Sequence, residues 1–532
     1  MRVLPLLVAI LLAAALPTHA QTSGYEQPLR PQVHFSPQHN WTNDPNGLVY
    51  FHGEYHLFFQ YNPFGDQWGH MSWGHAVSRD LLHWKELPVA IPELKTPQGT
   101  EMAFTGSIVV DEHNTSGLCT GNKPCMVAVY TGHHLSPNPA DKTTLQNQNL
   151  AVSNDDGRTW QRYSGNPVLD LHLSDFRDPS VFRDEERNRW VMAVALSLEH
   201  KVRLYASADL KQWTPLSDFG PTDTTGGAWE CPDLVRVPAE RSEATMWALK
   251  VGLGSNTPHG GSGEQYFLGT FDGTRFTPST LPGAHGWTNY GKDDYCAISF
   301  NHLPPDKEPR PILLGWMSNL QYASKLPTAP WRGQMSLPRR LSYISDEDGI
   351  ALRQQPITEP LRGARSTISS ARDLNRLPPF ELSLTFDEKA PGTTGLRLYT
   401  DDTHYTEIAY DNTSHVFYTD RTRSGADVAP GFPARTTAPL APNRAHDLRL
   451  IVDRISVESF AQQGTIAMTD LIFPTEKKSR IVFFTTTEPT TPATSTNAAK
   501  PAPEATAKPT VKGDLWILRS IWQQPSPQSS QP

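Results

Sequence analysis

The stretch Trp41-Thr42-Asn43-Asp44-Pro45-Asn46-Gly47 places an acidic residue directly before a proline at the start of an apolar segment. Two later stretches are similar: Phe176-Arg177-Asp178-Pro179 has the acid directly before the proline, and Trp229-Glu230-Cys231-Pro232 has it two positions before. Proline fixes its own φ and disfavours a helical conformation of the residue before it, so each acid lies on extended or turn backbone. A single Asp-Pro pair usually marks no more than a turn. Three such units ahead of strands predict one site assembled from separated parts of a repeating fold.

A turn that contains Asp and ends on an aromatic residue recurs along the same region. Its three clear copies, each with Ser at the start and Trp at the end, are residues 78–84, 153–160 and 207–213, and a weaker copy is residues 268–276. Serine and aspartate bond to neighbouring backbone in turns, and a short strand precedes each copy, which predicts hairpins. Together with the strand pairs before them, these turns divide residues 31–341 into five units of roughly 50–75 residues.

Repeated four-stranded units are typical of a β-propeller, in which the sheets surround a central channel. The opening residues of successive blades converge at one end of that channel, so the three acids are predicted to meet there. After about residue 365 the pattern changes to short strands without the tryptophan turn, as in residues 380–386 and 447–453, which indicates a β-sandwich. We predict an all-β chain, with a five-bladed propeller over residues 31–345 and a C-terminal sandwich over residues 365–524.

Two segments stand apart from these domains. Residues 1–20 have a positive start, an apolar stretch and a small-residue cleavage site, which predicts a signal peptide and a secreted protein. No later stretch approaches ~18 uninterrupted apolar residues, so no membrane contact is expected after its removal. Residues 485–512 are rich in Thr, Pro and Ala and are predicted to be disordered. Because residues 514–522 read as another strand, this tract is expected to join two sandwich strands.

Charge and cysteine content narrow the functional classes. The net charge of −8, without a basic run, argues against binding to nucleic acid. Cys119 and Cys125 bracket a short polar loop, which predicts a local disulfide in an exported protein. Cys231 is expected to be a free, packed thiol, and Cys296 either the same or its partner. No Cys/His spacing resembles a metal site, so neither a metal nor another cofactor is predicted.

Three acids at one site suit the hydrolysis of a glycosidic bond. That reaction needs a general acid and a second carboxylate across the bond, and a third carboxylate can orient sugar hydroxyls. The two reacting groups need different pKa values. We expect Arg177 to help keep Asp178 ionised, and Glu230, between apolar neighbours, to have the raised pKa. Asp44, with asparagines on both sides, suits an ionised nucleophile.

The chain resembles glycoside hydrolase family 32, which includes invertases, inulinases, levanases and related fructosyltransferases. The stretches that carry the likeness are residues 34–37, 41–47, 59–63, 72–76, 176–179 and 229–232, with 452–454, 457–458 and 472–474 near the C-terminus. The resemblance runs from about residue 31 to the final strand. It implies a five-bladed propeller with a β-sandwich, and a reaction that retains the anomeric configuration.

The resemblance also implies roles for individual residues. Asp44 corresponds to the nucleophile, Glu230 to the acid/base and Asp178 to the residue that stabilises the transition state. The residues that resemble the fructose-binding set of the family are Asn43, Gln60, Trp68, Phe104, Thr105, Arg177 and Trp331. Without the family, Gln60 would be read as a buried amide, Trp68 and Trp331 as core aromatics and Arg177 as a structural ion pair.

Two departures from the family pattern stand at the site. Thr42 replaces the usual Met and Thr105 the usual Ser. Thr42 also creates the glycosylation sequon Asn40-Trp41-Thr42, where a glycan would crowd the nucleophile, so this sequon is either unmodified or belongs to a source that does not glycosylate. Sequons at Asn114 and Asn412 lie away from the motifs.

The leading hypothesis is an exported enzyme that removes terminal β-linked fructose from fructans (inulin or levan) or from sucrose by exo attack. A fructosyltransferase would use the same site with a sugar acceptor in place of water. A lectin on the same fold is the alternative outside enzymes, and the intact set Asp44, Asp178 and Glu230 argues against it. The preferred fructan linkage and the oligomeric state stay open at this stage.

Overall fold

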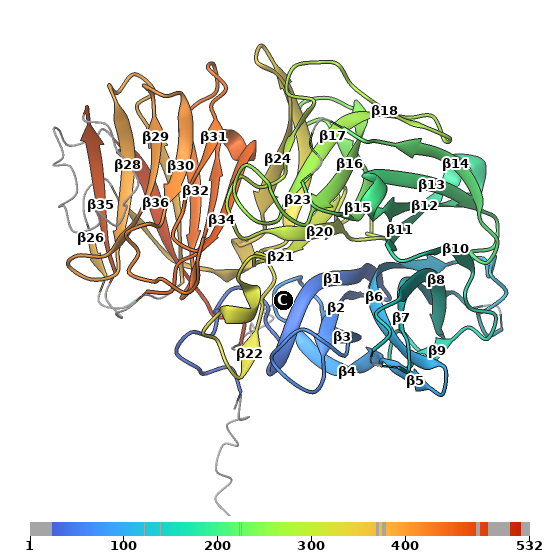
Figure 1. Ribbon diagram of the computed structural model, residues 1–532. Coiled ribbons are helices and arrows are strands. Elements are labelled where there is room, and N and C mark those ends of the chain that lie inside the picture. Colours follow the sequence, from blue (N-terminus) through green and yellow to red (C-terminus); the bar gives the residue numbers. More distant parts are fainter. Residues whose placement is uncertain are drawn as a thin grey trace, which may run out of the picture.

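The computed structural model describes residues 24–522 apart from residues 122, 139, 223, 225, 369–371, 375–378, 475–478 and 488–510. The predicted signal segment, residues 1–20, lies outside this part. The described chain forms two all-β bodies side by side, a propeller drawn in blue through yellow and a sandwich drawn in orange to red (Figure 1). The predicted fold class is confirmed. Within the described residues, no helix is both long enough and apolar enough to cross a bilayer.

Five antiparallel sheets succeed one another along residues 40–356 and form the blades. The first contains β1 (Asn40–Phe51), β2 (Glu54–Asn62), β3 (Ser72–Ser78) and β4 (Lys85–Ile91). The second contains β5 (Leu94–Thr96), β6 (Gly99–Asp111), β7 (Cys125–Leu135), β8 (Thr144–Ser153), β9 (Gln161–Arg162) and β10 (Leu169–Leu173). The third contains β11 (Phe176–Asp184), β12 (Arg189–Leu196), β13 (Lys201–Ser207) and β14 (Thr214–Phe219).

The fourth and fifth blades complete the propeller. The fourth contains β15 (Trp229–Pro238), β16 (Thr245–Leu253), β17 (Gly263–Phe271), β18 (Phe276–Pro278) and β19 (His285–Trp287). The fifth contains β20 (Tyr295–Ser299), β21 (Ile312–Trp316), β23 (Arg339–Asp346) and β24 (Gly349–Pro356). Five short 3₁₀ helices interrupt the described strands: η1 (Glu185–Arg187), η2 (Ser197–Glu199), η3 (Ala323–Lys325), η4 (Glu359–Leu361) and η5 (Gln462–Gly464). The fifth blade continues to Pro356, past residue 345.

The innermost strands of the blades form a closed ring. β1 contacts β6 and β20, β11 contacts β6 and β15, and β15 contacts β20, so each inner strand has a neighbour on both sides. The ring is fastened by β22 (Trp331–Arg332), which comes late in the propeller and pairs in parallel with the start of β1. This arrangement brings the starts of β1, β11 and β15, with their acids, to one end of the channel.

The repeated turns connect strands within blades, as expected from the sequence. In the first copy, Ser78 Oγ donates to Asp80 Oδ1 over 3.0 Å, and Asp80 accepts hydrogen bonds from the backbone N–H groups of Leu82 and His83. The copies after β8 and β13 use Ser153 with Asp155 and Ser207 with Asp209 in the same way. The aspartate side chain thus accepts hydrogen bonds from the backbone N–H groups that a tight turn leaves without a backbone partner.

Two six-stranded sheets form the sandwich. One has the order β25 (Arg362–Thr367), β36 (Val511–Leu518), β27 (Phe380–Phe386), β32 (Asp447–Val452), β33 (Ser456–Ala461) and β34 (Ile466–Leu471). The other has the order β26 (Arg372–Leu374), β35 (Ser479–Thr486), β28 (Thr393–Tyr399), β29 (Tyr405–Asp411), β30 (Val416–Asp420) and β31 (Arg435–Pro439). Leu382, Leu396, Ile408 and Leu450 are fully buried between the sheets.

The tract predicted to be disordered connects β35 and β36, which belong to opposite sheets. Its expected limits, residues 485–512, overlap these strands: Thr485 and Thr486 end β35, and Val511 and Lys512 begin β36. Residues 488–510 lie outside the described residues. The strand expected over residues 514–522 is β36, which starts earlier and ends at Leu518.

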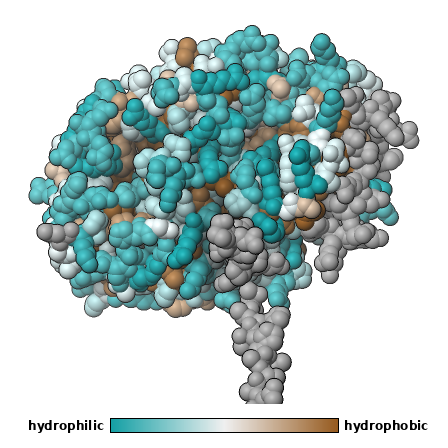
Figure 2. All heavy atoms as spheres, turned by 180° about the vertical axis from the view of Figure 1, so that it is seen from behind, coloured by the Kyte–Doolittle hydropathy of each residue, from teal (hydrophilic) through white to brown (hydrophobic). Residues whose placement is uncertain are grey.

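Most large apolar side chains of the described residues are buried in the cores, and a few, such as Phe64 and Leu198, are exposed. One core cluster joins the domains, with Phe35 and Phe59 from the propeller side packed against Phe460 of the sandwich. The face shown in Figure 2 is mostly hydrophilic, with small, scattered apolar areas. In the second blade, Cys119 and Cys125 form the expected disulfide, which closes a short loop ahead of β7.

Candidate active site

All five innermost strands carry a break in register with the neighbouring strand of their blade. The breaks lie between Thr42 and Pro45, Ala103 and Gly106, Arg177 and Ser180, Glu230 and Asp233, and Tyr295 and Ile298. A β-bulge bends the strand and redirects a side chain away from the ladder. Asp44, Thr105 and Asp178 fall inside these breaks, and Glu230 lies at the edge of one. Because the inner strands are neighbours around the channel, the bulges bring these side chains together.

Asp44, a residue of intermediate exposure, contributes a carboxyl group from β1. Thr105 Oγ1 on β6 donates a hydrogen bond of 2.9 Å to Asp44 Oδ2. The surrounding protein excludes water and raises the pKa of Asp44 to about 6, with a further rise from Glu230, while the bond from Thr105 opposes the shift. The structure therefore differs from the expectation that nearby donors make Asp44 readily ionised, because desolvation outweighs them.

Asp178 lies deeper, with 5% of its surface exposed, in a backbone conformation with φ of 64°. Its Oδ2 accepts a hydrogen bond of 2.9 Å from the backbone N–H of Cys231, and its own N–H donates to Thr131 Oγ1 over 2.9 Å. Burial raises the pKa of Asp178 to about 7; Arg177 opposes this rise, and Glu230 and Asp44 add to it. Arg177 was expected to keep Asp178 ionised, but desolvation prevails.

Glu230 is held by two side chains from neighbouring blades. The guanidinium of Arg177 donates to Glu230 Oε1 through Nε at 3.3 Å and Nη2 at 3.2 Å, so Arg177 bonds to Glu230 and acts on the neighbouring Asp178 through its charge. The same guanidinium donates to Asp175 at 2.7 Å, which fixes its orientation. The Tyr295 hydroxyl donates to Glu230 Oε2. Together these contacts fix both carboxylate oxygens of Glu230.

Tyr295 is a site residue that the sequence analysis did not single out. It opens the fifth inner strand at the level where Glu230 opens the fourth, and it is buried. Burial, followed by the charge of Glu230, raises the pKa of the Tyr295 hydroxyl, so Tyr295 acts as a hydrogen-bond donor. Its position at the start of a repeated unit was the signal that could have revealed it.

The predicted sugar-binding residues lie in three settings. Asn43 Oδ1 accepts a hydrogen bond of 2.7 Å from the Trp41 indole, and Gln60 Nε2 donates to the Ala103 carbonyl over 3.0 Å, which joins the first two blades beside Thr105. Phe104 stacks on His133 with ring centroids 4.3 Å apart and meets Trp68 edge-on at 6.1 Å. Trp68 is 53% exposed, so these rings form part of the rim of the site.

The structure places Trp331 apart from this rim. Its ring is buried, packs with Met317 and Tyr322 in the cluster that also contains sandwich residues, and carries the Arg30 guanidinium 4.4 Å above its centroid. Trp41 and Trp316, with ring centroids 6.1 Å apart, belong instead to the core cluster that contains Cys231, Tyr295 and Cys296. Trp331 thus supports β1 from the side through its pairing with Asn40.

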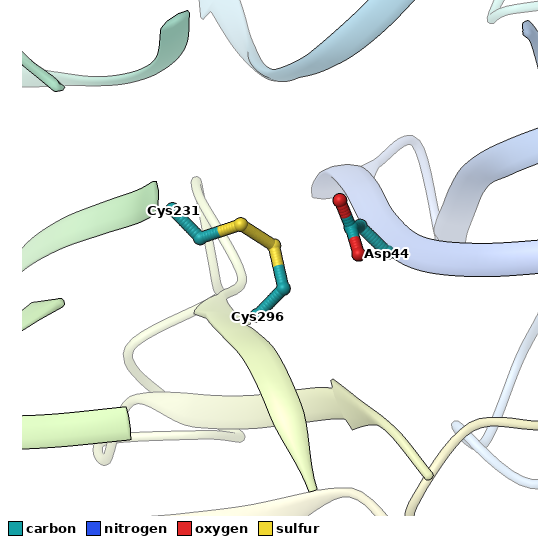
Figure 3. Close-up of side chains that lie close together, drawn as sticks. All are labelled: Asp44, Cys231 and Cys296. Atoms are coloured by element: carbon teal, nitrogen blue, oxygen red, sulfur yellow. A yellow bond between two sulfur atoms is a disulfide. The ribbon is translucent and has the colours of Figure 1, made fainter. Parts of the chain in front are cut away.

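Cys231 and Cys296 form a second disulfide, so the prediction of a free thiol at Cys231 is wrong. The two residues are adjacent in space because β15 and β20 are neighbouring inner strands. A carboxylate oxygen of Asp44 and the two sulfur atoms lie within 4.8 Å of one another (Figure 3). Two thiolates and a carboxylate could bind a metal ion, but sulfur atoms in a disulfide are not thiolates and do not offer this site.

Comparison with known proteins agrees with this geometry. Residues 34–356 match the glycosyl hydrolases family 32 N-terminal domain, and residues 351–500 match the glycosyl hydrolases family 32 C terminal. The chain belongs to glycoside hydrolase family 32. It is therefore a glycoside hydrolase, and the resemblance inferred from the motifs is confirmed.

Relatives of this family 32 enzyme cover most of its length. A levanase of Bacillus subtilis (strain 168) is 42% identical over 476 residues, which cover 86% of this chain and 68% of the levanase. An extracellular exo-inulinase of Aspergillus awamori is 40% identical over 496 residues, which cover 85% of this chain and 90% of the inulinase. The crystal structure of exo-inulinase from Aspergillus awamori has a TM-score of 0.82 at 35% identity and covers 94% of this chain and 100% of that one.

Proposed function

We propose that this family 32 enzyme releases terminal β-D-fructose from fructans or sucrose by exo attack, with retention of configuration. The observation that carries the proposal is the meeting of Asp44, Asp178 and Glu230 at one end of the channel, with Arg177 and Tyr295 fixing Glu230. The names of the relatives, levanase and exo-inulinase, support a fructan or sucrose as the substrate.

In the proposed reaction, Glu230 donates a proton to the glycosidic oxygen while a carboxylate oxygen of Asp44 attacks the anomeric carbon. The fructosyl group then forms an ester with Asp44, and water activated by Glu230 hydrolyses this ester with a second inversion, which restores the original configuration. Asp178, behind the other two acids, binds sugar hydroxyls, and its hydrogen bonds to these hydroxyls strengthen as charge develops on the ring. Thr105 keeps the reacting oxygen of Asp44 aligned.

Exo attack is supported by the closed channel beneath the acids. Thr105, Asp178 and Cys231 line a cavity of only about 10 Å³, which is enough for one water molecule. Farther along, the Asn301 amide donates to the carbonyls of Ile108 and Val181 at 2.8 and 2.9 Å and ties three blades together across the channel. A polymer cannot continue through this end, so the site suits a chain terminus.

Product analysis tests the proposal. Early digests of inulin and levan should contain free fructose with few short oligomers, and sucrose should yield glucose and fructose. A ladder of oligosaccharides that appears first would reject exo attack. Longer oligosaccharides formed from concentrated sucrose would favour the transferase, and binding without release of fructose would favour the lectin. NMR of the first product anomer checks retention independently, since inversion would give the opposite anomer.

We further propose that the protein is exported. The support is the signal-like composition of residues 1–20 and the extracellular description of the Aspergillus exo-inulinase. The expected outcome in a host with a secretion pathway is enzyme in the medium or periplasm that lacks these residues, as measured by N-terminal sequencing. Intact enzyme confined to the cytoplasm of such a host would reject this proposal.

A further inference from the structure

The second disulfide occupies a place in the site that the proposed reaction has not used. Cys231 directly follows Glu230 on β15, and Cys296 directly follows Tyr295 on β20, and the two cysteines are 65 positions apart in the sequence. Their Cα atoms are 5.3 Å apart and both side chains are buried. The disulfide therefore links the backbones of the fourth and fifth blades one residue beyond the hydrogen bond from Tyr295 to Glu230.

The backbone at both cysteines is unusual for residues with a side chain. Cys231 has φ of 47° and Cys296 has φ of 49°, in the left-handed region, and each lies within the register break of its inner strand. Such conformations persist where the surrounding structure holds them. A covalent link between the two bulges provides that restraint. It also holds the Cys231 N–H, which donates to Asp178 over 2.9 Å.

The sulfur atoms also face the nucleophile. They lie within 4.8 Å of an Asp44 oxygen, across from the carboxyl group that would attack the sugar (Figure 3). A disulfide is apolar and binds water poorly, so it helps to exclude water from this side of Asp44. The disulfide is thus connected to all three acids. Cys231 adjoins Glu230 in the backbone, its N–H bonds to Asp178, and the sulfur atoms lie beside Asp44.

We propose that Cys231 and Cys296 are positioning residues: their disulfide holds the Glu230 carboxyl against Tyr295 and opposite Asp44, and full activity requires it to be oxidised. This inference rests on the proposed acid/base role of Glu230. Reduction by a dithiol transfers two electrons and two protons to the disulfide, yields two thiols and oxidises the reagent to its cyclic disulfide. The bulges of the fourth and fifth blades are then free to separate, and Glu230 loses its fixed direction.

The main test compares two double variants of the enzyme. Cys231→Ala/Cys296→Ala removes the link at the site, and Cys119→Ala/Cys125→Ala removes the disulfide of the second blade as the matched control. General acid catalysis contributes about 10²–10⁴ in rate, so partial misplacement of Glu230 should lower kcat on sucrose by about 10- to 100-fold. The control should stay within about twofold of the wild type.

A second substrate, with a leaving group that needs no protonation, distinguishes a positioning role of the disulfide from a general loss of structure. Departure of p-nitrophenolate from p-nitrophenyl β-D-fructofuranoside needs no proton, so this step does not depend on the general acid. The site variant should therefore keep most of its kcat/KM, which reports the steps up to departure of the leaving group, on the aryl fructoside while losing kcat/KM on sucrose. Hydrolysis of the ester also uses Glu230 and is common to both substrates, so kcat itself is not compared between them. Equal losses of kcat/KM on both substrates, or kcat on sucrose equal to that of the control, would overturn the proposal.

A double-mutant cycle with Tyr295→Phe adds an independent readout. In the wild type, removal of the Tyr295 hydroxyl should lower kcat on sucrose several-fold, because Glu230 loses a partner. In the site variant the same substitution should have little further effect, because the pair is already separated. Strictly additive losses would show that the disulfide does not act through this hydrogen bond.

Reduction of the wild-type enzyme covers the case in which the site variant fails to fold. Mass spectrometry after alkylation counts the thiols at each pair, and activity is measured before reduction, after reduction and after reoxidation. We expect sucrose hydrolysis to fall as Cys231 and Cys296 are alkylated and to return on reoxidation. Full activity with both residues reduced would reject the inference. No release of fructose by the untreated wild type would instead reject the proposed function.

Discussion

The protein buries charged groups in two places and pairs them differently. Between propeller and sandwich, the Arg421 guanidinium donates to Asp293 at 2.5 Å, to the Tyr322 hydroxyl at 2.7 Å and to two backbone carbonyls. At the end of the channel, the Arg177 guanidinium lies near Glu230, Asp178 and Asp175, while Asp44 is bonded to the neutral Thr105 hydroxyl. Paired charges connect one domain to the other, whereas Asp44 and Asp178, which are bonded to neutral donors, have raised pKa values.

His34 shows the same completeness of pairing at the domain interface. Its Nδ1 lies 2.9 Å from Asp453 and its Nε2 lies 3.2 Å from Glu458, both in the sandwich. Burial alone would lower the pKa of His34, but the hydrogen bonds to these two carboxylates outweigh it and raise the pKa to about 9. The interface thus keeps the charge of His34 by pairing it, whereas Asp44 and Asp178 at the site have raised pKa values.

The largest effect is expected at Asp44 and Glu230, the two carboxyl groups that are proposed to react. Asp44→Asn and Glu230→Gln should each lower kcat on sucrose by about 10⁴-fold or more, because one removes the nucleophile and the other the acid/base, while the amides preserve shape. Steady-state kinetics measures the loss, and circular dichroism checks the fold. Asp272→Asn, in the turn after β17, is the matched control and should keep normal kcat. Near-normal turnover of either site variant would contradict the assignment.

The second-largest effect is expected at Arg421, the paired cation between propeller and sandwich. Arg421→Met should lower the free energy of unfolding by about 3–5 kcal/mol, because it leaves Asp293 buried without its cation. Denaturant unfolding measures the loss, and kcat per folded molecule should stay within about twofold. Arg365→Met removes an exposed pair with Asp514 and should leave the unfolding free energy nearly unchanged. Similar losses in both variants would show that burial is not what gives the interface its strength.

A third prediction uses pH to show that the site destabilises the fold. Burial raises the pKa of Asp178 to about 7, above its unfolded value, so the folded state binds the proton more tightly. Stability from this group is therefore present at low pH and is lost as pH rises from about 4 to 7. Asp178→Asn keeps an oxygen for the Cys231 N–H but carries no charge, and it should raise the free energy of unfolding by about 2 kcal/mol at pH 8.

Paired melting curves check this prediction. The Tm of Asp178→Asn should exceed that of the wild type by a few degrees at pH 8, and the difference should vanish near pH 4, where the wild-type group is protonated in the folded state. Titrating groups far from Asp178 change both proteins alike and cancel in the difference, whereas Asp44 and Glu230 interact with Asp178 and contribute to it. A variant that is less stable than the wild type at pH 8 would contradict the view that Asp178 is strained by its neighbours.

The blades and the three acids could be predicted from the sequence because both depend on local patterns. A proline after an acid, or a Ser-Asp turn before Trp84, is visible within a few residues. The contacts between blades are not. That Cys231 pairs with Cys296, and that Arg177 turns to Glu230 instead of its neighbour Asp178, follows from which inner strands adjoin and where each one bulges. These features depend on closure of the ring, which no short segment encodes.

The smallest effect is expected where no buried charge is involved, in the connection between β35 and β36. Thr486 ends one strand and Val511 begins the other, on opposite sheets, which pack about 10 Å apart. Eight Gly and Ser residues span up to about 26 Å and can replace residues 488–510 without moving either strand. The Tm should change by less than about 2 °C, since the buried side chains of β36, Leu515 and Leu518, keep their places.

Truncation before Val511 is the comparison: it removes the strand between β25 and β27 and should unfold the sandwich, although Arg421 and His34 are untouched. Equal tolerance of both changes would mean that the paired charges alone hold the sandwich to the propeller.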